Sequence, residues 1–138
     1  MDRHLSVRTR FLWSPRHLLL VDGVGALMTS ASTGLLLATE VLASGIPSWV
    51  LWILASVAFG YACFDAVGVF YVSDPRPFLS GIAILNLVYC FITLVICCVF
   101  SRQLTWLGMI YFSLEAIVVI PLALWERRIA LSIDLLSN

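Results

Sequence analysis

Three carboxylic acids lie inside long apolar stretches of this sequence, where ionisable side chains are rare. These acids are Asp22, Asp65 and Glu115, and an amide, Asn86, lies in a further apolar stretch between the last two. A charged side chain at the centre of a bilayer costs about 2.5 to 3.5 kcal/mol, so acids at such positions usually mark a cavity, a proton path or a ligand site. The sequence therefore indicates a polar site inside a membrane protein.

Glu115 is the most unusual of the three acids, because it lies halfway along an apolar run that begins at Trp106 and ends at Trp125. The sequence has no basic residue at a comparable depth, and hydrocarbon favours the uncharged form of a carboxylic acid. We therefore expect Glu115 to be protonated and hydrogen-bonded rather than ion-paired. Asp22 and Asp65 are shallower and could reach an arginine. The candidate hydrogen-bond partners of Glu115 are Asn86, Tyr89 and Tyr111.

Four apolar segments are long enough to place these residues inside a bilayer. They cover about residues 18–43, 47–72, 78–101 and 104–125, and about 20 apolar residues suffice to cross a hydrocarbon core. Of the 138 residues, 62% are hydrophobic and 12% are charged, which is too apolar for a soluble domain of this size. The runs are continuous rather than alternating, which favours helices over a barrel. We predict an all-α membrane four-helix bundle.

Short connections and the placement of arginine predict the topology. The turns at 44–47 and 73–77 contain glycine or proline, and short links favour an up-down-up-down bundle. Seven of the eight arginines fall on one side and only Arg102 on the other, so both termini are expected in the cytoplasm. The predicted parts are a basic arm at 1–17, a transmembrane domain at 18–128 and a short cytoplasmic tail at 129–138. We expect the arm to be retained, because Asp22 interrupts the first apolar run and three more spans follow.

The polar residues of the four spans are predicted to lie in one layer of the inner half of the membrane. Counted at 1.5 Å per residue, the depths of Asp22, Asp65, Asn86 and Glu115 are about 6, 10, 12 and 15 Å. Tyrosines on the same helical faces are expected to line a shared cavity, or simply to pack: Tyr61, Tyr89 and Tyr111. The alternative is a purely structural layer, in which interhelical hydrogen bonds contribute about 0.6 kcal/mol each.

The motifs of common enzyme classes are missing from this sequence. It has no glycine-rich phosphate loop, no HExxH, no GxSxG and no histidine within a span, so we expect neither an enzyme nor a bound cofactor. The four cysteines lack CxxC or Cys/His spacing and are interpreted as small apolar residues rather than metal ligands. A formal net charge of zero argues against binding to nucleic acid.

Three short segments suggest relatives of this chain: DGVGA at 22–26, GIP at 45–47 and NLVYC at 86–90. In these the chain resembles small four-span bacterial inner-membrane proteins of unassigned function. The resemblance implies the four-span architecture and a multi-pass location in the inner (plasma) membrane, and it brings no site residues with it.

The acidic layer supports two functional hypotheses. The first is a non-catalytic membrane protein whose buried polar cavity binds a small or lipidic ligand, or which docks to a larger membrane complex. The second is a small proton- or cation-coupled transporter or channel that uses the intramembrane acids. The expected partners are the lipid bilayer and a possible second copy of the chain. A series of small residues in the first span permits close contact between helices: Ala26, Ser30, Gly34 and Ala38.

Overall fold

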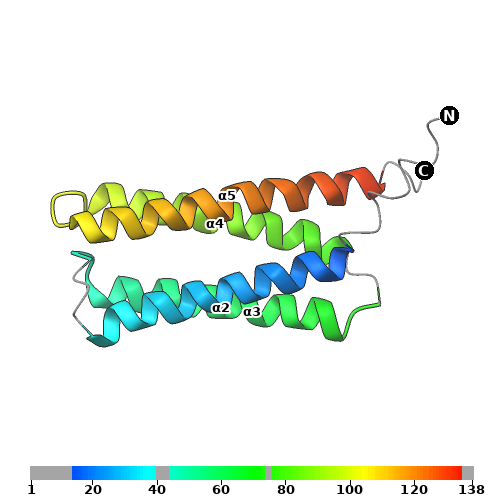
Figure 1. Cartoon of the computed structure of the whole chain (residues 1–138), viewed down its shortest axis with the longest axis horizontal. Helices are drawn as coiled ribbons and strands as arrows, with labels where there is room; N and C mark the ends of the chain where they lie inside the picture. Colours follow the sequence, from blue (N-terminus) through cyan, green and yellow to red (C-terminus); the bar gives the residue numbers. More distant parts are fainter. Residues whose placement is uncertain (1–13, 40–43, 74–75, 135–138) are drawn as a thin grey trace.

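The computed structural model describes residues 14–39, 44–73 and 76–134, and this part of the chain forms four long helices (Figure 1). The helices are α2 (Pro15–Thr39), α3 (Ser48–Phe70), α4 (Arg76–Val99) and α5 (Trp106–Asp134). Within the described residues there is no strand, so the expected all-helical class is confirmed. Most of the predicted N-terminal arm, residues 1–13, lies outside the described residues.

All four helices are long and apolar enough to cross a membrane, and the chain is a multi-pass membrane protein. The candidate spans are Pro15–Leu35, Ser48–Phe70, Pro77–Val99 and Trp106–Ile129. The last helix extends beyond the predicted end of its apolar run and continues to Asp134, so part of the predicted tail at 129–138 is helical. The first helix begins at Pro15, a residue suited to the first helical position, directly after Ser14, whose carbonyl and hydroxyl oxygens accept from the His17 N–H.

The helices associate as two pairs, α2 with α3 and α4 with α5 (Figure 1). Following the colours of the ribbon, each helix begins at the end of the molecule where the preceding helix finishes. Gly23 permits the close approach of α2 to α3, because a Cβ at this position would lie 3.1 Å from the Cβ of Asp65. Ser30 adds a hydrogen bond between the same helices, from its hydroxyl to the carbonyl oxygen of Ala55 at 2.9 Å.

The two helix pairs meet at the end of the molecule that carries the α2–α3 and α4–α5 connections. The Thr105 N–H donates to the Ser44 carbonyl oxygen at 3.0 Å. Gly45 has a φ of 81°, in the left-handed region that favours glycine. A Cβ at Gly45 would also overlap the carbonyl oxygen of Gln103, at a distance of 1.7 Å. These contacts hold the two connections against each other.

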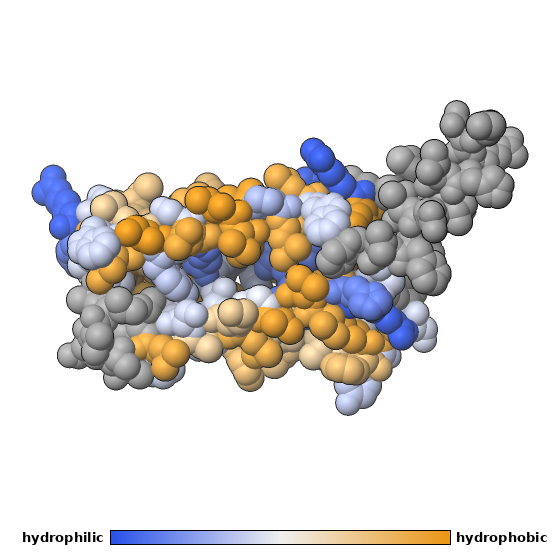
Figure 2. Space-filling model, viewed as in Figure 1, coloured by the Kyte–Doolittle hydropathy of each residue, from blue (hydrophilic) through white to orange (hydrophobic). Residues whose placement is uncertain are grey.

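Large apolar side chains cover the outside of the helices, as expected for a surface in contact with lipid. Examples are Met28, Phe70, Val99 and Ile117, each at least 66% exposed. Figure 2 shows hydrophobic side chains over most of the visible face and hydrophilic ones at both ends. Polar and acidic residues are buried instead: Asp22, Thr33, Ser44, Asp65, Asn86, Thr93 and Glu126. The described part of the chain thus buries polar side chains among apolar ones and exposes large apolar side chains along its spans.

Two buried apolar clusters lie toward opposite ends of the helices. One, formed by residues at the starts of α2 and α4, consists of Leu18, Leu19, Leu79 and Ile82. The other is centred on the start of α3 and consists of Ile46, Val50, Leu51, Leu54, Tyr89 and Phe112. Most of the buried polar side chains of the spans therefore lie between two apolar regions, which restricts how water could reach them along the helix axes.

Candidate functional site

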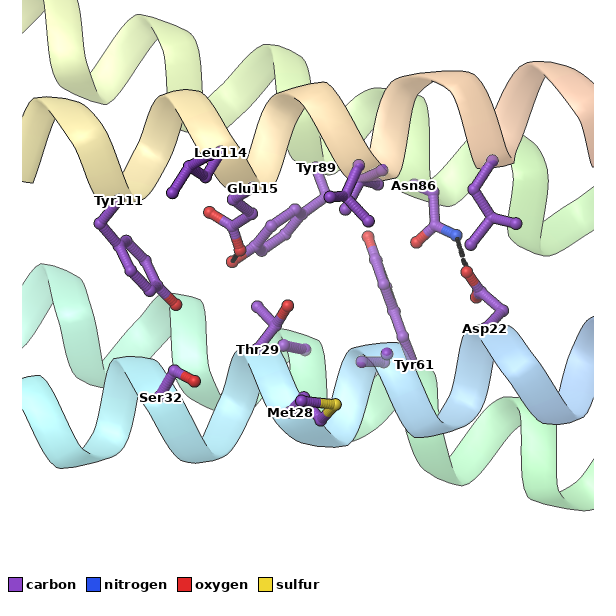
Figure 3. Close-up of a pocket in the computed structure, with 16 residues that line it drawn as sticks. Asp22, Met28, Thr29, Ser32, Tyr61, Asn86, Tyr89, Tyr111, Leu114 and Glu115 are labelled. Carbon is purple, nitrogen blue, oxygen red and sulfur yellow. Dashed lines mark hydrogen bonds between the residues drawn. The ribbon is translucent and has the colours of Figure 1, made fainter.

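A cavity of about 420 Å³ lies between the two helix pairs. Figure 2 shows a hollow on the face between α2 and α5, with hydrophilic side chains inside it, and Figure 3 shows the side chains that line it. All four helices contribute to the wall. The polar lining residues are Asp22, Thr29, Ser32, Tyr61, Asn86, Tyr89, Tyr111 and Glu115. Apolar lining residues include Met28, Leu114, Val118 and Leu122.

Six of the seven residues proposed from the sequence line this cavity, and Asp65 does not. Asp65 is 1% exposed and lies behind the wall, against the backbone of Gly23. The seven residues therefore come from adjoining parts of one interior, but they do not form a single layer. In Figure 3, Asn86 and Asp22 lie on one side of Tyr61, and Glu115 lies on the other.

One end of the cavity is closed by a hydrogen-bonded pair from α2 and α4. The side-chain amide of Asn86 donates to both carboxyl oxygens of Asp22, at 2.8 and 2.9 Å. Both side chains are 5% exposed, so the amide replaces the water that a carboxyl group would otherwise bind. The sequence suggested an arginine for Asp22 and Asn86 for Glu115, whereas in the structure Asn86 bonds Asp22. Arg16 donates instead to the carbonyl oxygen of Val72 at 3.1 Å.

Two further buried acids, Asp65 and Glu126, lie near Asp22 but are not part of the cavity wall. Asp65 interacts electrostatically with Asp22 and with Glu126, and Glu126 interacts with Asp22. Glu126 is 0% exposed, and neither its oxygens nor those of Asp65 have a hydrogen-bond partner of normal geometry. Three carboxyl groups at one place repel each other when they are charged.

Glu126 is the residue that the sequence interpretation missed. It directly follows Trp125 and precedes Arg127, which made it resemble a residue of the membrane boundary. The helix instead continues to Asp134 and keeps Glu126 inside the bundle. Its spacing carried the missing signal, because Glu126 follows Glu115 by eleven residues, about three helical turns, and so lies on nearly the same face of α5.

The other end of the cavity contains Glu115 and two tyrosines. The Tyr89 hydroxyl donates to Glu115 Oε1 at 3.3 Å, which confirms one of the three partners expected from the sequence. The Tyr111 hydroxyl is paired instead with the Thr33 hydroxyl at 2.9 Å, joining α5 to α2. Glu115 Oε2 is buried and has no hydrogen-bond partner of normal geometry, although the Thr29 side chain interacts with the same carboxyl group. The carboxyl group therefore has acceptor capacity left beside the cavity.

Tyr61 lies in the middle of the cavity wall. Its hydroxyl donates to the carbonyl oxygen of Leu85 at 3.3 Å, which joins α3 to α4. Its ring meets that of Tyr89 edge to face, with centroids 6.1 Å apart. The hydrogen bonds of the cavity wall thus connect both helix pairs, which provides the structural role expected of interhelical polar contacts.

The described residues place no basic side chain in the cavity wall. Arg16, Arg102, Arg127 and Arg128 are all exposed. No group of three or more histidine, cysteine or acidic side chains within the described residues is arranged to hold a metal ion. The site therefore offers carboxyl, hydroxyl and amide groups together with aromatic rings, and its formal charges can only be negative.

Comparison of the chain with known protein families, with curated proteins and with solved structures finds no match in any of the three.

Proposed function

We propose that this chain is a non-catalytic, multi-pass protein of the bacterial inner (plasma) membrane whose cavity binds a small or lipidic amphiphile. The cavity carries the proposal, because it combines a polar interior at Glu115 and Asp22 with an apolar rim. Its volume of about 420 Å³ lies within the range of about 300 to 1,000 Å³ that is typical of ligand pockets. An amphiphile matches both parts of such a wall.

The direction of the opening favours a ligand that arrives from the membrane. The cavity opens between α2 and α5, whose contacts are far fewer than those within each helix pair (Figures 1 and 2). Met28 lines this opening and is 67% exposed, as a lipid-facing side chain would be. Buried apolar clusters lie toward both ends of the bundle and oppose entry along its axis.

A cavity-filling variant tests the proposal. Thr29 lines the cavity and lies beside the carboxyl group of Glu115 (Figure 3), so Thr29→Trp would fill the space next to that carboxyl group. We expect native mass spectrometry of the protein, released from mild detergent, to detect a bound amphiphile in the wild type and not in Thr29→Trp. Gly60→Leu is the control, since Gly60 is exposed and has open space beside it. Equal amphiphile content in wild type and a folded Thr29→Trp protein would contradict the proposal.

The orientation of the helices is part of the same proposal. We infer an up-down-up-down passage through the membrane with both termini in the cytoplasm, because the arginines concentrate on that side. Single cysteines introduced near Ser44 and Arg102, in a background without native cysteines, should react with an impermeant maleimide added outside. Cysteines near Arg76 and Asn138 should not react. Labelling near Arg76 in intact cells would contradict this orientation.

Proton- or cation-coupled transport is the second candidate, favoured by one observation at Asp65. This buried side chain lies beside the carboxyl group of Asp22 and interacts with it, so the two acids could share a proton and exchange it. Reconstituted protein should then dissipate an imposed pH gradient in vesicles, and Asp65→Asn should abolish the flux. Flux no greater than that of protein-free vesicles would exclude this candidate.

A further inference from the structure

The charge of the cavity wall restricts the chemistry of its ligand. Asp22 and Glu115 are the only residues of the wall that carry a full charge on ionising near neutral pH, and both become negative. Asp22 is already bonded through both oxygens to Asn86, whereas Glu115 accepts a single hydrogen bond, from Tyr89. An anionic head group would find no counter-charge here. A cationic head group would find one at Glu115.

Aromatic rings reinforce this preference for a cation. Tyr61 and Tyr89 meet edge to face at 6.1 Å between centroids, and Tyr111 lines the same cavity beside Glu115 (Figure 3). The face of an aromatic ring attracts a cation within about 6 Å, by about 2 kcal/mol where water is excluded. A carboxylate surrounded by tyrosines is therefore a suitable site for an ammonium group.

The environment of Glu115 Oε2 suits a cationic group on the ligand. Oε2 is buried without a hydrogen-bond partner of normal geometry, while the Tyr89 hydroxyl donates to Oε1 and Thr29 lies beside the same carboxyl group. A positive charge placed there would compensate the carboxylate when Glu115 gives up its proton to water, and a ligand that also carries an N–H group could donate it to Oε2. The groups that face Glu115 from the packed helices are Thr29, Tyr89, Cys90, Cys97 and Tyr111, and none of them can carry a positive charge in place of the ligand.

The lining of the opening indicates that the ligand also has an apolar tail. Between the ammonium position and the lipid lie apolar side chains of α2 and α5: Met28, Leu114, Val118 and Leu122. An alkyl or aryl tail attached to the head group would pass between these side chains toward the membrane. The tail would then remain in an apolar environment throughout.

We propose that the cavity binds an ammonium group that carries an apolar tail, with the ammonium at Glu115 among the tyrosines and the tail directed out between α2 and α5. This inference rests on the proposed amphiphile-binding function and specifies its ligand class. The ammonium could belong to a free lipophilic amine or to the ethanolamine head group of a phospholipid.

Four probes of equal chain length test the inference: octyltrimethylammonium, octylamine, octanol and octanoate. Binding to the protein in micelles of dodecyl maltoside, an uncharged detergent without nitrogen, is measured by titration calorimetry, with binding to protein-free micelles subtracted. We expect the two cations to bind at least tenfold more tightly than octanol, and octanoate not to bind. A tenfold difference corresponds to about 1.4 kcal/mol. Equal or tighter binding of octanol or octanoate would overturn the ammonium assignment while leaving amphiphile binding intact.

Substitutions of single residues test whether the cationic group binds at Glu115. Glu115→Gln should weaken octyltrimethylammonium at least tenfold and change octanol less than threefold, whereas Glu126→Gln, which removes a buried acid outside the wall, should change neither. If Glu115→Gln fails to fold, Tyr61→Leu serves instead and should weaken the cation more than the alcohol. Unchanged cation binding in a folded Glu115→Gln protein would overturn the proposal.

Two further measurements separate the possible causes of each result. Adding phosphatidylethanolamine to the micelles should weaken cation binding only if a lipid head group is the natural occupant, so this arm distinguishes the two sources. Failure of all four probes to bind would overturn the ammonium assignment. In that case a bound amphiphile that is still lost in Thr29→Trp would show that the broader function stands.

Discussion

Replacing Glu126 by an apolar residue should stabilise the folded protein. Glu126 is completely buried, and neither of its carboxyl oxygens has a hydrogen-bond partner. In proteins, one buried polar group without a partner costs about 1 to 3 kcal/mol, and repulsion from Asp22 adds to this cost if both groups are charged. Methionine has a similar length and volume, so Glu126→Met would remove the cost without leaving a cavity.

We therefore expect Glu126→Met to raise the free energy of unfolding by about 1 to 3 kcal/mol. The measurement is reversible unfolding by sodium dodecyl sulfate in mixed micelles, followed by circular dichroism. Glu126→Gln is the matched control, since it preserves size and polarity and should leave the free energy of unfolding within about 1 kcal/mol of the wild type. A folded Glu126→Met protein that is less stable than wild type by more than about 1 kcal/mol would refute the reasoning, because Glu126 would then make a favourable contact.

Two other substitutions test the packing around the cavity, both by the same unfolding measurement. Asn86→Leu should destabilise by about 1 to 3 kcal/mol, because it leaves the buried carboxyl group of Asp22 without its donor; an unchanged stability would mean that this hydrogen bond contributes nothing. Gly45→Ala should destabilise by at least about 1 kcal/mol, because of its positive φ and the overlap with Gln103. The exposed Gly60→Ala should instead be neutral or stabilising by up to about 1 kcal/mol, and equal effects of the two glycine substitutions would contradict the role of the φ angle at Gly45.

The sequence was sufficient to predict the four apolar helices, because length and continuous hydrophobicity determine which segments can cross a bilayer. It also offered Tyr89 as one of three candidate partners of Glu115, since residues of similar depth on polar helix faces tend to meet inside a bundle, and the structure confirms Tyr89. These features depend on local composition and on the helical repeat, which a single sequence contains.

The pairing of individual side chains could not be predicted in the same way. Asn86 lies close in depth to Asp22, Asp65 and Glu115, and only the packing of the helices selects Asp22 as its partner. Asp65 is directed behind the cavity because Gly23 lets α3 approach α2 there. Such choices depend on the rotation and separation of whole helices, which sequence spacing does not determine.

The sequence was also a poor guide to where the buried part of the last helix ends. Hydrophobicity falls at Trp125, but the backbone of α5 continues to Asp134, so the sequence analysis did not single out the buried Glu126. Helix length and hydrophobic length are separate quantities, and a polar residue just beyond an apolar run can still face the interior of a bundle. The helical spacing from Glu115 is the better guide in this case.

The most direct test of the central claim is the reaction of the cavity acid with dicyclohexylcarbodiimide, a lipophilic reagent that modifies protonated carboxyl groups. The modified residue is located by peptide mass spectrometry, with and without octyltrimethylammonium. We predict that Glu115 is modified through the opening between α2 and α5, and that the cation protects it. Modification of Glu126 or Asp65 with none at Glu115, or modification of Glu115 that the cation leaves unchanged, would contradict a lipid-accessible cavity that binds its ligand at Glu115.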